Sequence, residues 1–579
     1  MIWPGALVQC AFFRTLHESK EEDELNNVTR WKMSRIRLLL YVSMASFVYY
    51  WLPGYIFPLL TAFSFLCLLK PNNVLFSQIT GISGLGVGSV QLDWSSITAF
   101  LGSPIVVNSQ SFRTSVLNYV RLLKRSKAVL IESAEPGWAH LNILFGFVVL
   151  VWIVVPIMYY TNTWGSKAFP LGTTDLYRAD GSLYDITVVL DQNSRLNETA
   201  YKQYGTIRLT VMFALAYGPT FAALTACIVH TILFHGKEII RQFNMSITEA
   251  MNEVHAKLMA KYGEAPEWWY TIVFCVNVFV ACLVCHFGDL MPWYWLFIAI
   301  IVVFVLLLPV GIVQALSNQQ LGLGVFSEFI GSYLMDSNPI GNGTFKTYTY
   351  ITEVQALRMI QALKLGHYMK VPPRIMFAAQ ISSAVISSVV SYEFGLFLLD
   401  GIKGICTAKN KEWQCPDPNV FYSASVIWGA VGAQKSFVNN DVSYYHIFWF
   451  FPLGAILPII QWLILQKWPS KFWLHYVHFP IMFASLSYLI PAPAGNFVSW
   501  LFLGLVFNYG IKKYVFDWWD RYAYITSAAL DIGVAFSSLL IFLALSNQSI
   551  SFPNWWGMGG PSYDGCPLSN ANYSGIIPG

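Results

Sequence analysis

Apolar segments long enough to cross a membrane recur along this chain and restrict the folds open to it. The clearest lie at 139–160, 207–234, 269–288, 293–316, 375–399, 447–465, 472–489, 496–512 and 522–545. A transmembrane helix needs about 20 apolar residues, and only helices or closed barrels satisfy the backbone inside lipid. Charged residues make up 11% of the chain, against about 25% in soluble domains. The sequence therefore predicts an all-α polytopic membrane protein, with about 10–13 transmembrane or re-entrant helices in a single bundle.

Four further apolar segments do not fit a single straight span. Residues 38–69 are too long for one and contain Leu-Pro-Gly at 52–54, which predicts a kinked helix or a tight helical pair. Residues 79–107 are rich in glycine, which favours irregular backbone covered by protein or water. Residues 322–335 and 421–431 are too short to span, and we expect them to be re-entrant.

The polar loops indicate how the chain crosses the membrane. Loop 14–37 is rich in Lys and Arg, which is typical of a cytoplasmic loop. Loop 161–206 and the tail 547–579 carry glycosylation sequons, so both are predicted to be extracellular or lumenal. The charged segment 108–136 interrupts an otherwise apolar region and is interpreted as an atypical insert. The remainder of 1–579 is predicted to form one transmembrane domain.

A polar helix between two apolar halves, 338–374, has the most unusual pattern. Polar side chains recur there at every third residue, at Thr352, Gln355, Arg358, Gln361 and Lys364. At 3.6 residues per turn such a row winds around the helix instead of keeping to one face. The helix is expected to end at Lys370-Val-Pro-Pro-Arg374, because consecutive prolines remove donors and force extended geometry. A winding polar row suits a helix that crosses an aqueous path.

The end of this helix carries a family resemblance. The sequence LKLGHYMKVPPR at 363–374 resembles the KIPPR-type motif of the oligopeptide transporter family of fungi and plants. Further blocks resemble the family in the same order: YYWLPGYIFP (49–58), LDWSSITAFLGSP (92–104), LFHGKEI (233–239), FYSASVIWG (421–429) and DWWDRYAYITSAALD (517–531). The resemblance covers most of the chain. Two departures are the absence of the family's N-terminal Asn-Pro-Gly motif with the spans around it, and the insert at 108–136.

The resemblance implies secondary active, proton-coupled transport of short oligopeptides such as tetra- and pentapeptides or glutathione-like molecules. Two alternatives remain: transport of metal chelates such as iron or copper complexes, and a transport-inactive truncated product. The expected partners are a small peptide-like substrate, protons and the lipid bilayer. The expected location is the plasma membrane, with an internal membrane as the alternative.

Other function classes find little support in the sequence. The net charge is +4, without a basic patch for nucleic acid. His17-Glu18 lacks the second histidine of a zinc-protease motif, and the chain has no Walker A sequence. We therefore expect neither an enzyme nor a cofactor. Cys275, Cys282, Cys285 and His286 lie in an apolar span, where helix packing is the better explanation than a metal site.

A zwitterionic peptide needs a cation for its carboxylate and an anion for its amine. The candidate substrate-binding residues are Arg358, Lys364, Lys370, Arg374, Glu353 and Glu328. For Lys370 and Arg374 the alternative is anchoring of the next span at the cytoplasmic face. For Arg358 and Lys364 it is a solvated helix face.

Proton coupling needs a titratable group at membrane depth, where ionisable residues are costly and functional by default. Glu393 and Asp531 are the first candidates because each lies inside an apolar segment. A structural interhelical hydrogen bond is the alternative for both. Asp93 and His230 are weaker candidates of the same kind. For His230 the alternative is an ordinary interior imidazole.

Two cysteines close a short loop that we expect on the oxidising side of the membrane. They are Cys406 and Cys415, and a disulfide between them is predicted. Cys566, in the tail, has no evident partner in the sequence.

Overall fold

A computed structural model describes most of the chain as a bundle of helices. The described residues are 3–17, 33–105, 137–192, 195–244, 254–335, 337–406, 416–438, 442, 444–489, 491–548, 550–560 and 562–578. Within these ranges, nine helical segments are long and apolar enough to cross a membrane. The predicted all-α polytopic membrane fold is confirmed. The proposed insert, 108–136, lies outside the described residues.

The first third of the chain contains short elements around two long helices. In order they are α1 (Pro4–His17), α3 (Arg35–Trp51), η1 (Leu52–Ile56), η2 (Pro58–Thr61), β1 (Phe63–Ser64), α4 (Phe65–Leu69), α5 (Val74–Thr80), β2 (Ser89–Val90), α6 (Trp94–Thr98), α8 (Trp138–Phe147), η4 (Val148–Val154) and α9 (Val155–Tyr160). The helix from Arg35 ends at Ile56 after one π-helical turn at the Leu-Pro-Gly sequence. Residues 57–69 then form short elements, so the expected kink is present but a second long helix is not.

The middle of the chain contains the most deeply buried long helical segment of the described residues, Val211–Phe243. Its elements are η5 (Thr163–Ala168), η6 (Ile186–Val189), α10 (Glu198–Tyr204), α11 (Val211–His230), η7 (Thr231–His235), α12 (Gly236–Phe243), α14 (Val254–Met259), α15 (Glu267–Phe287), α16 (Trp295–Ser317), α17 (Gly324–Leu334), α18 (Pro339–Lys346), η8 (Thr347–Ile351) and α19 (Thr352–Met369). As the prolines predict, α19 ends at Met369. Lys370 follows in the left-handed region, with φ 62°.

The last third returns to the bundle. It forms α20 (Pro373–Gly401), α21 (Pro416–Ser425), η9 (Val426–Gly432), η10 (Gln434–Val438), η11 (Tyr444–Trp449), α22 (Phe450–Lys467), η12 (Phe472–Tyr476), α23 (Phe479–Leu486), η13 (Ser487–Leu489), α24 (Ala494–Leu505), η14 (Val506–Ile511), α25 (Lys512–Tyr514), α26 (Phe516–Ala544), η15 (Ser546–Gln548) and η16 (Trp556–Met558). The predicted span at 472–489 is wrong, because its only α-helix is α23, of eight residues. All residues of α23 from Pro480 to Leu486 are buried, so its apolar sequence serves the protein interior.

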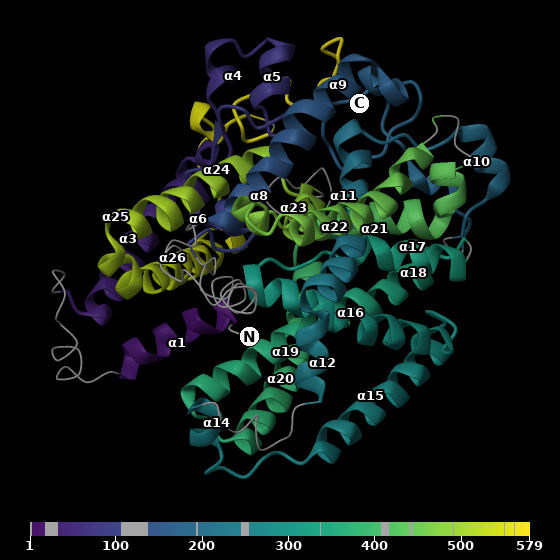
Figure 1. The fold of residues 1–579 in the computed structure, drawn as a ribbon. Coiled ribbons are helices and arrows are strands. Elements are labelled where there is room, and N and C mark those ends of the chain that lie inside the picture. Colours follow the sequence, from purple (N-terminus) through teal and green to yellow (C-terminus); the bar gives the residue numbers. More distant parts are fainter. Residues whose placement is uncertain are drawn as a thin grey trace.

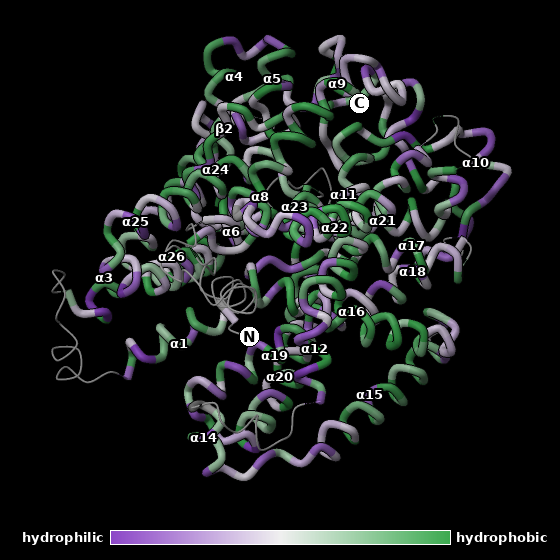
Figure 2. The backbone as a smooth tube through the Cα atoms, viewed as in Figure 1, coloured by the Kyte–Doolittle hydropathy of each residue, from purple (hydrophilic) through white to green (hydrophobic). Residues whose placement is uncertain are grey.

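Helix α11 lies at the centre of the fold. It is apolar around its whole circumference, as expected of a helix enclosed by protein. Helix α22 packs against it closely because Gly454 has no side chain: a Cβ there would overlap the carbonyl oxygen of Ala222. By contrast, α20 has no buried residue. Figure 2 shows that α16, which lies nearer the interior, consists largely of hydrophobic residues.

The described part of the glycine-rich segment, 79–105, has the irregular backbone that was expected. It is held by an antiparallel pair in which Phe63 faces Val90 and Ser64 faces Ser89. At Gly86, which has φ +71°, a Cβ would collide with the backbone at the start of α24. Figure 1 shows α4, α5, α9 and the C-terminal end grouped at one end of the molecule, with α14 at the opposite end.

Candidate functional site

A buried polar cluster lies where three short helices meet in the bundle: α17, α18 and η9. Asn338 caps α18 by accepting a hydrogen bond from the Gly341 amide at 2.9 Å, and Pro339 occupies the first turn. After Lys346 the helix widens into the π-helical segment η8. Threonine hydroxyls bond back to the preceding turn there, as Thr349 does to the Phe345 carbonyl at 2.7 Å. Such π segments are frequent at functional sites.

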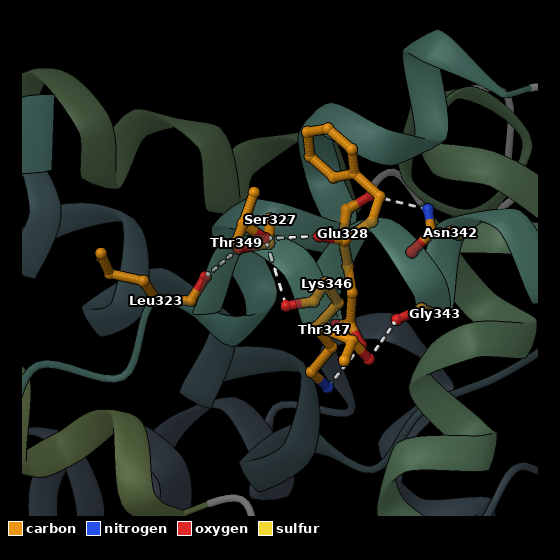
Figure 3. Close-up of polar contacts among 9 residues, drawn as sticks. Leu323, Ser327, Glu328, Asn342, Gly343, Lys346, Thr347 and Thr349 are labelled. Atoms are coloured by element: carbon orange, nitrogen blue, oxygen red, sulfur yellow. Dashed lines mark hydrogen bonds and ion pairs between the residues drawn. The ribbon is translucent and has the colours of Figure 1, made fainter. Parts of the chain in front are cut away.

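The centre of the cluster is an ion pair between Glu328 and Lys346 (Figure 3). The Lys346 Nζ lies 2.6 Å from Glu328 Oε1, and the two side chains are 13% and 0% exposed. Asn342 donates its Nδ2–H to the Glu328 carbonyl at 2.9 Å, and Lys346 lies 4.3 Å above the ring centre of Phe421. Among the described residues, the second carboxylate oxygen of Glu328 has no hydrogen-bond partner. The pair therefore brings both signs of charge into the interior.

A second carboxylate, Glu353, lies beside this cluster. It is 1% exposed, and neither of its oxygens has a hydrogen-bond partner among the described residues. It lines a small cavity together with Ser327, Thr349 and Tyr350. Ser327 is the chain neighbour of Glu328, so the cavity adjoins the ion pair across α17.

The other predicted substrate-binding residues lie away from this cluster. Arg358 is exposed on α19, and Lys364, half-buried on the same helix, lies 5.1 Å above the ring of Tyr368. Lys370 ends α19 and donates from its Nζ to the His367 carbonyl at 3.0 Å. Arg374 donates from its Nε to the Glu264 carbonyl at 3.1 Å. The contacts of Lys370 and Arg374 are those of residues that anchor a helix end, and substrate binding by the four cations stays a prediction.

Three of the predicted proton-coupling residues are acids on separate elements. Asp531, on α26, accepts a hydrogen bond from the Trp94 indole N–H at 2.6 Å. Glu393 is exposed on α20. Asp93 is 2% exposed and caps α6, accepting hydrogen bonds from the Ser96 amide at 3.0 Å and its hydroxyl at 2.7 Å. The structure does not bring these carboxylates together, and a proton-coupling role for each stays a prediction.

The fourth, His230, belongs to a group of aromatic rings at the end of α11. Its ring centre lies 4.3 Å from that of His478 and 4.4 Å from that of Phe234. The Nδ1 of His478 accepts a hydrogen bond from the Ile481 amide at 3.3 Å and so caps α23. His230 is 5% exposed and packs inside the protein, and a proton-coupling role for it stays a prediction.

The cysteines form a disulfide that the sequence did not indicate. Cys67 pairs with Cys566, their Cα atoms 5.2 Å apart, which supplies the partner that was not evident for Cys566 in the sequence. Cys406 is also disulfide-bonded, whereas Cys415 lies outside the described residues. Within the described part of the chain, no group of three or more His, Cys, Asp or Glu side chains is arranged to hold a metal ion.

Sequence reasoning missed two residues of the buried cluster, Lys346 and Asn342. Both lie inside the polar segment 338–374, but neither belongs to the row that recurs at every third residue. A lysine next to an apolar segment usually extends to the membrane surface. The available signal was the NPIGNGTFK sequence at 338–346, in which Asn-Pro starts a new helix at membrane depth.

Comparisons with known proteins agree over nearly the whole chain. A family model described as OPT oligopeptide transporter protein matches residues 1–120 and 127–545. The chain is 37% identical to Oligopeptide transporter 7 of Arabidopsis thaliana, over 98% of its own length and 70% of that protein. It is also 37% identical to Oligopeptide transporter 5 of the same plant, over 98% of this chain and 72% of the relative. No solved structure shows significant similarity.

Proposed function

Because the chain belongs to the oligopeptide transporter family, we propose that it moves short oligopeptides across a membrane by secondary active, proton-coupled transport. The proposed substrates are tetra- and pentapeptides and glutathione-like molecules, and the proposed location is the plasma membrane. Multi-pass membrane insertion follows from the nine apolar helical segments of the described chain.

The observation that carries this proposal is the buried ion pair of Glu328 and Lys346. A peptide has an amine and a carboxylate, and the pair offers the complementary charge to each. Separating a buried pair costs about 3–5 kcal/mol when one charge is left alone. The cost falls if the two ends of a peptide take the places of the two side chains. A buried pair held between two neighbouring helices, α17 and α18, is therefore suited to exchanging its internal contact for a zwitterionic substrate.

The experiment is uptake of a radiolabelled tetrapeptide by proteoliposomes that contain the purified protein. With an inward proton gradient the peptide is expected to accumulate, and a protonophore should collapse that accumulation. Accumulation that survives the protonophore would remove the proton-coupling part of the proposal. An excess of unlabelled tetrapeptide should compete, whereas displacement by an iron or copper chelate alone would favour the chelate alternative. Absence of any uptake by correctly folded protein would favour the transport-inactive alternative.

A further inference from the structure

Glu353 is a carboxylic acid whose carboxylate oxygens contact no cation among the described residues. Its side chain is buried, and neither oxygen has a hydrogen-bond partner within the part of the chain that the structure describes. The neighbouring Glu328 is as deeply buried, but Lys346 neutralises it at 2.6 Å. Two buried glutamates thus lie close together, and only Glu328 has a cation beside its carboxylate.

The cavity beside Glu353 lies near the middle of the membrane-spanning part. Its apolar wall includes Val302 and Leu306, and Leu306 is the twelfth of the 23 residues of α16. The volume of the cavity that the centre of a water molecule can occupy is about 10 Å³. This is about the volume that a cavity needs to hold one water. The hydroxyl-bearing side chains of Ser327, Thr349 and Tyr350 line it with the carboxyl group. A carboxyl group at this depth therefore has polar neighbours and room for about one water.

The energetics favour the neutral form of Glu353 in this conformation. An unpaired carboxylate at membrane depth costs about 2.5–3.5 kcal/mol on insertion scales, and a buried acid normally avoids such a cost by holding its proton. Ionisation therefore requires a conformation in which water or a cation reaches the side chain. Alternating access in secondary transporters supplies such a change, because one bundle of helices rocks against another around the binding site.

We propose that Glu353 is the carboxyl group that binds and releases the transported proton. The proton arrives from water on one side of the membrane and adds to a carboxylate oxygen of Glu353. The protonated acid is then enclosed among α16, α17 and η8, and the O–H bond breaks when the site opens to water on the other side. This inference rests on the proposed proton-coupled transport and names the residue that would perform it.

Among the described residues, the titratable groups that interact with Glu353 come from three elements, and none of them is a cation. Tyr350 of η8, Cys227 of α11 and Tyr488 of η13 lie within electrostatic range of the carboxyl group. Helices α16 and α17 contribute apolar side chains and Ser327 to the cavity wall. Arg358 interacts electrostatically with Tyr350 and is exposed on the other side of α19. Of these side chains, the carboxyl group is the strongest acid, so we assign the exchanged proton to it.

The test compares Glu353→Gln with the wild type in proteoliposomes, using the labelled tetrapeptide in two assays. One assay measures accumulation driven by a proton gradient, and the other measures peptide exchange with equal pH and unlabelled peptide inside. Glutamine mimics the protonated acid but cannot release a proton. We expect exchange within about twofold of the wild-type rate, at least tenfold less accumulation, and uptake that no longer varies with pH. Glu267→Gln, which alters an exposed glutamate at the start of α15, is the matched control and should behave like the wild type.

Three results would overturn this assignment. The first is a Glu353→Gln protein that accumulates peptide with the wild-type pH profile. The second is a folded Glu353→Gln protein that has lost exchange as well, since the residue would then have a structural role. The third is loss of coupling on Asp531→Asn or Glu393→Gln while Glu353→Gln keeps it.

If Glu353→Gln does not fold, Glu353→Asp takes its place, and an unshifted pH profile there contradicts the proposal. If the wild type itself fails to accumulate peptide, the proposed function fails instead.

Discussion

Two interior glutamates, Glu328 and Glu353, differ mainly in what faces them. Lys346 lies 2.6 Å from Glu328, whereas no described residue bonds to the carboxylate of Glu353. In an ion pair each charge stabilises the other, while an isolated carboxyl group changes charge when its surroundings change. The two residues are therefore suited to different tasks, substrate contact and proton transfer.

The role of the ion pair can be tested with variants that separate its effect on protein stability from its effect on peptide uptake. Lys346→Met leaves Glu328 buried without a cation, and we expect a loss of about 3–5 kcal/mol in the free energy of unfolding. The double variant Glu328→Gln/Lys346→Met removes both charges and should recover most of that stability, yet take up no tetrapeptide. Thermal unfolding in detergent and the uptake assay measure the two effects. Wild-type uptake by the double variant would contradict a role for the pair in substrate binding.

The matched control is the exposed ion pair of Lys435 and Glu198. Its Nζ–Oε1 distance is 2.7 Å, close to that of the buried pair, but its side chains are 33% and 62% exposed. Exposed pairs contribute about 0–1 kcal/mol. Lys435→Met should therefore change stability by less than about 1 kcal/mol, with peptide uptake retained.

At the scale of elements, the fold depends on close contact between helices and on short helices that do not span. The central helix α11 packs directly against α22 at Gly454. Helices α17 and α23 have only 11 and 8 residues, too few to span a membrane, whereas α18 continues through η8 into α19. In membranes, small residues permit the backbone approach that holds long helices together.

The contact at Gly454 predicts that replacing this glycine with alanine lowers stability, whereas the same replacement at Gly395 raises it. Gly454→Ala adds a Cβ that would overlap the Ala222 carbonyl, so we expect a loss of about 1–3 kcal/mol from overpacking. Gly395, inside α20, has no atom within 4 Å of an added Cβ. Gly395→Ala should therefore gain up to about 1 kcal/mol through helix propensity. Thermal unfolding of both variants measures the difference, and equal shifts would argue against the close crossing of α11 and α22.

At the scale of the whole molecule, the C-terminal tail covers one end of the bundle. The Tyr573 amide donates to the Lys167 carbonyl at 3.2 Å, and Lys167 lies 4.5 Å above the Tyr573 ring. Asp564 accepts from the Ile82 amide at 2.8 Å, in the glycine-rich segment. The tail and the start of loop 161–206 therefore lie on the same side of the membrane. The assignment of that side as the outer one stays a prediction.

The disulfide between Cys67 and Cys566 connects parts of the chain 499 residues apart. Loss of a native disulfide costs about 2–5 kcal/mol in small secreted domains, so Cys67→Ser/Cys566→Ser should lower the unfolding temperature. Cys275→Ser, which alters an exposed free cysteine, should leave it nearly unchanged. Peptide mapping without reductant should recover the two cysteine peptides as one linked species. Separate peptides from unreduced protein would contradict the pairing.

Sequence patterns decided the fold class and many of the boundaries. Apolar length predicted the membrane-spanning helices because lipid leaves the backbone no other partners. The prolines at 372–373 predicted that the helix stops within Lys370–Arg374, since they remove the donors that a helix needs, and α19 does end just before it, at Met369. At 472–489 the same apolar signal was misleading. It does not distinguish a helix facing lipid from one enclosed by protein, as α23 is.

The sequence by itself therefore determined that the chain is a helical membrane protein of the oligopeptide transporter type. Only the tertiary structure decided which side chains pair. Lys346 forms an ion pair with Glu328, Cys67 forms a disulfide with Cys566, and Glu353 has no described hydrogen-bond partner. The physical reason is that apolar length and prolines act through the local backbone, and can be read in order along the chain. A charge or thiol is matched by groups far away in sequence, and the packing of the helices sets that distance.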